Sequence, residues 1–77
     1  MKISIVSGYF NPLNPGHLEM LEAAKEMSEK LVVIVNNNKQ LLTKEGEIAF
    51  NAAERVKAVR KVKFVDEAMI SIDELDE

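Results

Sequence analysis

Cysteine is absent from this chain of 77 residues. Its absence excludes a disulfide framework, a thiolate metal site and a cysteine nucleophile. Long apolar runs are also missing, since the longest, Leu31 to Val35, is far shorter than the roughly 20 residues that a membrane-spanning helix requires. The first residues contain no apolar signal region either. We therefore expect a cytoplasmic protein that has no membrane partner.

The chain is short enough that its length limits its core. A domain of this size buries only about 60% of the surface that its unfolded form exposes. We expect one domain over residues 1–77, and a partner that covers part of its surface would add to its stability.

The net charge of -3 conceals a separation of charge along the chain. From Asp66 onward there are six acidic residues and no basic one, which leaves an excess of bases before it. The acidic end, including residues 73–77, is typical of a solvated terminus, and the basic body suits an anionic ligand. Nucleic acid is not an expected partner, because the basic cluster falls on a predicted helix whose polar face needs charge in any case. That cluster consists of Arg55, Lys57, Arg60, Lys61 and Lys63.

Strand and helix patterns alternate along the chain. A β-branched run starts at Ile3 and ends at a turn signal, Ser7–Gly8. The continuous apolar run at 31–35 is typical of a central parallel strand that is covered on both faces. Apolar residues spaced three and four apart predict the helices. The predicted order is a strand ending at 7–8, a helix over 15–29, a strand over 31–35, a helix over 50–63 and a strand over 68–72, with a mobile loop over 39–47.

This order predicts the α/β class. With right-handed crossovers, β-α-β-α-β gives a three-stranded parallel sheet in 3-2-1 order, which is half of a doubly wound, Rossmann-like unit. The first strand then lies at a sheet edge, and its unpaired backbone groups favour pairing with another chain. We therefore predict a homodimer that forms through this edge.

The segment after the first strand holds both prolines and two of the three glycines. Asn14 suits the N-cap of the following helix, and Pro15 suits its first position. Gly8 and Gly16 permit close approach of the backbone to a ligand, and a helix N-terminus attracts phosphate. We expect Asn36–Asn38, after the second strand, to face the same crevice.

His17, the sole histidine, lies in the first turn of this helix. A helix N-terminus disfavours a charged imidazolium, so we expect a neutral ring that offers an N–H donor to a phosphate oxygen. A capping or packing role would explain the same position.

Residues 8–18, GYFNPLNPGHL, resemble the G-x-F-D-x-x-H-x-G-H signature of the cytidylyltransferase-like nucleotidyltransferases, and of their glycerol-3-phosphate cytidylyltransferase branch in particular. The similarity continues at 21–25, 31–38, 54–55 and 65–67. The resemblance implies transfer of a nucleotidyl group from CTP or ATP, with Mg²⁺, to a phosphorylated small molecule, with release of pyrophosphate.

The resemblance also implies roles for individual residues. His17 would hydrogen-bond the phosphates as charge builds in the transition state. Lys44 or Lys39 would be the phosphate-binding lysine, although each also suits a solvated loop position. Arg55 would brace the site or would be a surface helix arginine. The predicted catalytic residues are His17, Asn14 and Lys44, the predicted nucleotide-binding residues are Gly8, Tyr9, Phe10, Asn11, Gly16, Asn36, Lys39 and Arg55, and no protein metal ligand is predicted.

Two departures from the family pattern support an alternative. Asn14 replaces the first histidine of the signature and Asn11 its aspartate, and an amide cannot supply a cationic donor. Loss of one such donor costs on the order of 10²- to 10³-fold in rate. In addition, nothing after Ile72 matches the late serine/threonine motif of the family, so the resemblance covers its N-terminal half. The alternative is a non-catalytic nucleotide-binding or structural half-domain that homodimerises through the first strand.

Overall fold

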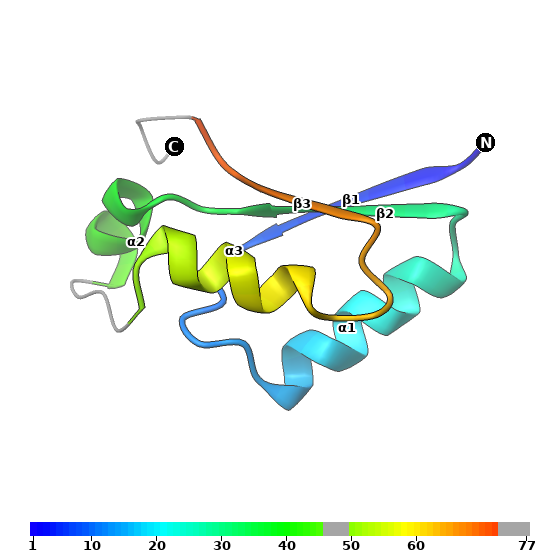
Figure 1. Cartoon of the computed structure of the whole chain (residues 1–77), viewed down its shortest axis with the longest axis horizontal. Helices are drawn as coiled ribbons and strands as arrows, with labels where there is room; N and C mark the ends of the chain where they lie inside the picture. Colours follow the sequence, from blue (N-terminus) through cyan, green and yellow to red (C-terminus); the bar gives the residue numbers. More distant parts are fainter. Residues whose placement is uncertain (46–49, 73–77) are drawn as a thin grey trace.

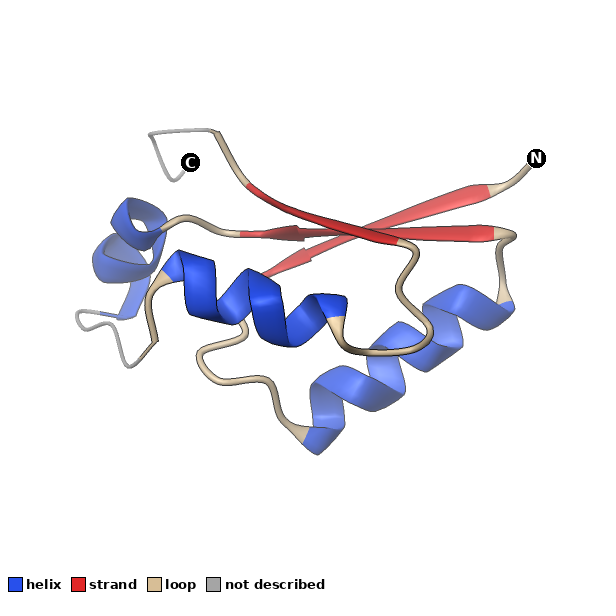
Figure 2. Ribbon diagram, in the orientation of Figure 1, coloured by secondary structure: helices blue, strands red, loops and turns tan. Residues whose placement is uncertain are grey.

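The computed structural model describes residues 1–45 and 50–72. A three-stranded parallel sheet carries helices on one face, as Figure 1 and Figure 2 show. The elements are β1 (Ile3–Gly8), α1 (Pro15–Glu26), β2 (Lys30–Val35), α2 (Asn38–Glu45), α3 (Ala52–Arg60) and β3 (Glu67–Ile70).

The sheet has the order β1-β2-β3, which is the predicted 3-2-1 order read from the other edge. β2 lies in the centre, where Val32 is level with Ile5 of β1 on one side and with Glu67 of β3 on the other. The α/β prediction and the edge position of β1 are therefore confirmed.

The helices α1 and α3 cover only one face of the sheet (Figure 1). Leu31, Val33 and Val35 are fully buried on that face and form the core together with Leu21 of α1 and further residues of α3 and β3. The prediction that strand 31–35 is covered on both faces is wrong for the part of the chain that the structure describes. β1 is likewise exposed at every second residue. The reason is topological, because successive crossovers in one direction place their helices on the same side of the sheet.

The start of α1 agrees with the prediction in detail. Asn14 is the N-cap, and Pro15 occupies the first turn. The helix ends earlier than the predicted residue 29, since Met27 is the C-cap, where the Met27 N–H donates to the Ala24 carbonyl and the Ser28 N–H to the Lys25 carbonyl.

The segment predicted as a mobile loop over 39–47 contains α2. Leu41 is fully buried, and burial of this side chain explains why a mostly polar segment forms a helix that its composition alone did not indicate. Its neighbour Leu42 is 53% exposed. Residues 46–47 of the predicted loop lie outside the described residues.

The last two elements are shifted from their predicted bounds of 50–63 and 68–72. α3 begins later because Asn51 caps it, with its side chain accepting from the Glu54 N–H while the Glu54 side chain accepts from the Asn51 N–H. It ends at Arg60, and a turn leads into β3. The predicted acidic end at 73–77 lies outside the described residues. None of the helices in the described ranges is long and apolar enough to span a membrane.

Asp66 forms hydrogen bonds both to α1 and to the sheet. Its Oδ2 accepts from Lys25 Nζ and from the backbone N–H of Leu31, both at 2.7 Å. The Lys25 hydrogen bond, followed by that of Leu31, lowers the pKa of the Asp66 carboxyl. The ionised carboxylate therefore fixes the α1 helix against the start of β2.

Candidate functional site

A pocket of about 450 Å³ opens at the carboxyl end of β1, between the following loop and the start of α1. Ligands in open α/β sheets bind beyond the carboxyl ends of strands, so this is the expected location. Six of the predicted site residues line the pocket. They are Gly8, Tyr9, Phe10, Asn11, Asn14 and His17, and Ser7, Pro12 and Met20 complete the lining.

Phe10 shapes the loop. Its φ of 52° lies in the left-handed region that side chains rarely adopt, and its ring is 1% exposed. The ring lies against Gly8, where a Cβ atom would be 3.0 Å from Phe10 Cζ. Gly8 is thus required for close packing of this ring, and burial of the ring holds the unusual backbone conformation in place. In the same loop, the peptide bond between Asn11 and Pro12 is cis.

His17 is held by two contacts. Its Nδ1 accepts a hydrogen bond from the backbone N–H of Asn14 at 3.1 Å, and its ring packs edge-on against Phe10 with the centroids 4.8 Å apart. In the reciprocal half of this capping box, Asn14 Oδ1 accepts from the His17 N–H at 3.0 Å. Because Nδ1 is an acceptor here, the neutral ring carries its proton on Nε2. A donor is therefore available to an anion at the helix N-terminus.

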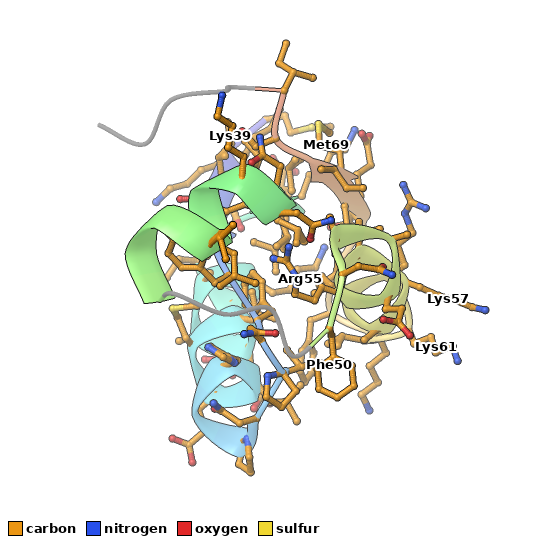
Figure 3. All side chains as sticks on the ribbon, turned by 90° about the vertical axis from the view of Figure 1, so that its left-hand side faces the viewer. Lys39, Phe50, Arg55, Lys57, Lys61 and Met69 are labelled. Atoms are coloured by element: carbon orange, nitrogen blue, oxygen red, sulfur yellow. The ribbon has the colours of Figure 1, made fainter. Side chains whose placement is uncertain are left out.

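Arg55 is buried, with 2% exposure, and it is neither a surface arginine nor a lining residue of the 450 Å³ pocket. Its Nη1 donates to the carbonyls of Tyr9 at 2.8 Å and of Asn36 at 2.7 Å, and its Nε donates to the Phe50 carbonyl at 2.8 Å. Nη2 reaches Asn38 Oδ1 at 2.9 Å. Figure 3 shows Arg55 pointing between α2 and α3, while Lys57 and Lys61 point away from the molecule. Arg55 therefore joins the loops after β1 and β2.

The remaining predicted residues lie elsewhere. Gly16 is exposed on the first turn of α1, and Lys39 is exposed on the first turn of α2. Asn36 pairs with β1 through its N–H, which donates to the Gly8 carbonyl at 2.9 Å. None of these three lines the pocket of about 450 Å³, and that Asn36–Asn38 face the same crevice stays a prediction. Lys44 belongs to α2, and its side chain lies outside the described part of the structure.

Two residues at or near the site, Met20 and Asn38, were not predicted from the sequence. Met20 lines the pocket because it lies three residues after His17 on the same helix face, a spacing that could have indicated it. Asn38 supports the loops, since its Oδ1 accepts from the Ala52 N–H at 2.8 Å as well as from Arg55. No local sequence pattern indicates these contacts of Asn38, because they join residues that are distant in the sequence.

A second pocket of about 310 Å³ adjoins the first and shares Phe10 and Pro12 with it. Its other lining residues come from the loop and from α3 and its N-terminal flank. They are Leu13, Phe50, Glu54, Arg55 and Ala58.

The first pocket has no carboxylate in its lining. Within residues 1–45 and 50–72, no group of three or more histidine, aspartate or glutamate residues could hold a metal ion. Mg²⁺ at nucleotide sites is commonly held by one or two carboxylates together with phosphate oxygens, and the lining of this pocket supplies only other side chains.

A three-stranded parallel sheet with a pocket at its first strand–helix turn, next to a helix N-terminus, places the chain in the Rossmann-like α/β class. Comparison with known proteins specifies the family. The chain belongs to the cytidylyltransferase-like family, whose model matches residues 5–77. This confirms the resemblance that the signature indicated.

The similar proteins are longer than this chain. It is 38% identical over 71 residues to "FAD synthase" of Thermococcus sibiricus, covering 90% of this chain and 48% of that protein. It is 34% identical over 67 residues to "FAD synthase" of Pyrococcus abyssi, covering 86% and 45%. A solved structure, the lipopolysaccharide core biosynthesis protein from Thermoplasma volcanium, superposes with a TM-score of 0.81 at 28% identity, over 92% of this chain and 58% of that one. The chain thus spans about half the length of the curated relatives it matches.

Proposed function

We propose that the pocket after β1 binds the phosphates of a nucleoside triphosphate, and that the chain supplies this part of a nucleotidyltransferase. The observation that supports it is the fixed donor arrangement at the start of α1. His17 carries its proton on Nε2, and the N-terminal amides of a 12-residue helix add partial positive charge. A phosphate group is the ligand that such a site attracts.

In the proposed reaction, a phosphate oxygen of the acceptor attacks the α-phosphorus of the nucleotide. A new P–O bond forms, and the bond between the α-phosphorus and the bridging oxygen breaks. Pyrophosphate leaves with that electron pair. Magnesium bound to the nucleotide would neutralise phosphate charge. This chain's own contribution is to position the phosphates near the positive end of the α1 dipole and to donate a hydrogen bond from His17 Nε2 as charge develops.

Among the nucleotides predicted from the sequence, we propose ATP rather than CTP. The relatives named FAD synthase support this choice, because FAD contains an adenylyl group. The pocket of about 310 Å³ beside the phosphate site suits the apolar part of a phosphorylated acceptor, since Leu13, Phe50 and Ala58 line it. A flavin mononucleotide is the acceptor to test first.

Pyrophosphate release tests the proposal. The chain is incubated with MgATP or MgCTP and a panel of phosphorylated acceptors that includes FMN and glycerol 3-phosphate. We expect release with ATP, a loss of at least about tenfold in His17→Ala, and a gain in Asn14→His because a cationic donor is restored. If neither the wild type nor Asn14→His binds any nucleotide, the assignment of the site is wrong.

The second candidate function is nucleotide binding without turnover. Asn14 favours this candidate, because its role as the N-cap of α1 explains an asparagine at this position without a catalytic role. The candidate is also favoured because the chain spans only 48% of the Thermococcus sibiricus relative. Nucleotide binding without pyrophosphate release in the wild type, together with release in Asn14→His, would support this candidate. The homodimer through β1 that the sequence predicts belongs to this second candidate, and light scattering tests it, since a monomer at tens of micromolar would contradict it.

A further inference from the structure

Phe50 presents an exposed aromatic ring to a pocket. It lies directly before Asn51, the N-cap of α3, and it is 42% exposed. It lines the pocket of about 310 Å³ together with Leu13 and Ala58. In Figure 3 its ring lies beside the start of α3, on the side toward α1. Ligand pockets are typically lined by apolar and aromatic side chains, so this ring is placed to contact a ligand.

The backbone of Phe50 is held on both sides. Its N–H donates to Asn11 Oδ1 at 2.9 Å, and its carbonyl accepts from Arg55 Nε at 2.8 Å. Two residues later, the Ala52 N–H donates to Asn38 Oδ1 at 2.8 Å. The exposed ring is therefore carried by a fixed backbone, and a ligand that contacts it restricts only the rotation of the side chain. A contact surface prepared in this way lowers the entropic cost of binding.

The other walls of this pocket favour a planar ring. Leu13 and Ala58 supply aliphatic surface, and the Glu54 carboxylate offers an acceptor to a ring N–H. An aromatic side chain stabilises a planar ring through offset or edge-to-face contact, which an aliphatic chain cannot form. Such stacking accepts different heterocycles, since each has a π-face. The pocket therefore suits a planar heteroaromatic ring.

This pocket adjoins the proposed phosphate site. Phe10 and Pro12 line both pockets. In the proposed reaction, the phosphate of the acceptor meets the nucleotide phosphates in the first pocket, and the rest of the acceptor extends from there. A ligand with a phosphate at one end and a planar ring at the other can therefore occupy both pockets. FMN has this form, whereas glycerol 3-phosphate has no ring to place beside Phe50.

We propose that Phe50 is a specificity-determining residue for the phosphorylated acceptor. Its ring stacks on the planar heteroaromatic ring of the acceptor, and Asn11 and Arg55 hold its backbone in the position that this contact requires. The two pockets thereby select a phosphate that carries such a ring over an aliphatic phosphate. The assignment rests on the proposed function, because that function places the reacting phosphate in the neighbouring pocket.

Flavin binding tests this role without nucleotide. FMN and riboflavin are titrated with the 77-residue chain, and the fluorescence anisotropy of the flavin reports binding. Riboflavin has no phosphate, so it measures the ring contact apart from the phosphate pocket. We expect both flavins to bind the wild type. Phe50→Ala should weaken riboflavin binding at least about tenfold, since loss of a stacking side chain has an effect of this size.

Two further variants separate stacking from apolar bulk. Phe50→Leu keeps an apolar side chain without a ring and should weaken riboflavin binding about two- to tenfold. Phe50→Tyr keeps the ring and should bind riboflavin within about twofold of the wild type. Circular dichroism verifies that each variant is folded.

The matched control is Met27→Ala, which removes an apolar side chain that is 64% exposed at the C-cap of α1, outside the two pockets. This variant should bind both flavins as the wild type does. Absence of FMN and riboflavin binding by the wild type would overturn the proposal. Unchanged riboflavin binding in Phe50→Ala, or equal binding by Phe50→Leu and the wild type, would overturn it as well.

The outcome is distinct from that of the proposed function, because no nucleotide is present. Flavin binding that depends on Phe50 would support the role of this residue even if MgATP did not bind. MgATP binding without flavin binding would overturn the role of Phe50 alone.

Discussion

Arg55 shows how a single side chain can support the loop after β1 without lining the pocket of about 450 Å³ that this loop borders. Its guanidinium donates to three backbone carbonyls, of Tyr9, Asn36 and Phe50. These carbonyls belong to three segments that are distant in the sequence. Arginine is suited to this task because its planar group presents five donors in a fixed geometry. We regard Arg55 as a positioning residue for the loop that carries Tyr9 and Phe10.

Arg55→Met should lower the free energy of unfolding by about 3 kcal/mol or more, because it leaves several partly buried carbonyls without a donor. Arg55→Lys should recover only part of the loss, since one ammonium cannot reach all of these acceptors. Urea unfolding measures the change. Lys57→Met, on an exposed position of the same helix, is the control and should stay within about 0.5 kcal/mol of the wild type. Equal stability of Arg55→Met and Lys57→Met would contradict this role.

Residues with local roles could be predicted from the sequence, whereas residues with distant partners could not. Asn14 and Pro15 were assigned to the start of α1 because capping depends only on residues a few positions away. The burial of Arg55 depends on contacts across 19 and 46 positions of sequence. Its spacing, three residues after Ala52 and four before Val59, indicates the buried face of α3, but this spacing does not identify the carbonyls to which Arg55 donates.

At the scale of elements, α2 shows the same distinction. Its composition is mostly polar, and its helical state depends on the burial of Leu41 under tertiary contacts. The strands β1 and β2 could be predicted because short runs of β-branched and other apolar residues favour strands. The coverage of their faces was not, since it depends on which side of the sheet each crossover takes.

Leu41→Ala should destabilise the protein by about 2–4 kcal/mol, because it removes a fully buried side chain. Leu42→Ala, one residue away on the same helix and 53% exposed, should change stability by less than about 0.5 kcal/mol. Thermal or urea unfolding of the two variants side by side measures the difference. Similar losses in both would mean that α2 does not pack through Leu41.

The contact between α1 and the sheet should depend on pH through Asp66. The hydrogen bonds from Lys25 and Leu31 hold the folded pKa of Asp66 below its ordinary value of 3.8. A carboxyl whose pKa is lowered on folding contributes stability above its unfolded pKa, and this contribution is lost as the pH falls through the folded pKa. Wild-type stability should therefore decrease in acid below about pH 4.

Asp66→Asn should lower the melting temperature at pH 7. Between pH 5 and pH 2, the melting temperature of this variant should decrease less than that of the wild type. Scanning calorimetry over this range measures both effects. Glu19→Gln, on the exposed surface of α1, serves as the control for a general loss of negative charge. An acid profile of Asp66→Asn that runs parallel to the wild type would show that Asp66 does not carry this dependence.

At the scale of the whole molecule, α1 and α3 cover one face of the three-stranded sheet in the part of the chain that the structure describes. The turn after β1, with Phe10 and His17, lies at the carboxyl end of this sheet. The pocket thus opens beside an edge strand and the start of α1. This arrangement accounts for the position of the proposed phosphate site.

The central claim, that the turn after β1 binds nucleotide phosphates, is tested most directly by NMR. The ¹⁵N-labelled chain is titrated with MgATP to millimolar concentration, which detects weak binding by the isolated chain. We predict the largest shifts in the backbone amides of Gly8, Tyr9 and His17 and in the His17 ring, and their loss in His17→Ala. Spectra of the folded chain in which these resonances remain unmoved, or in which the shifts cluster elsewhere, would contradict the claim.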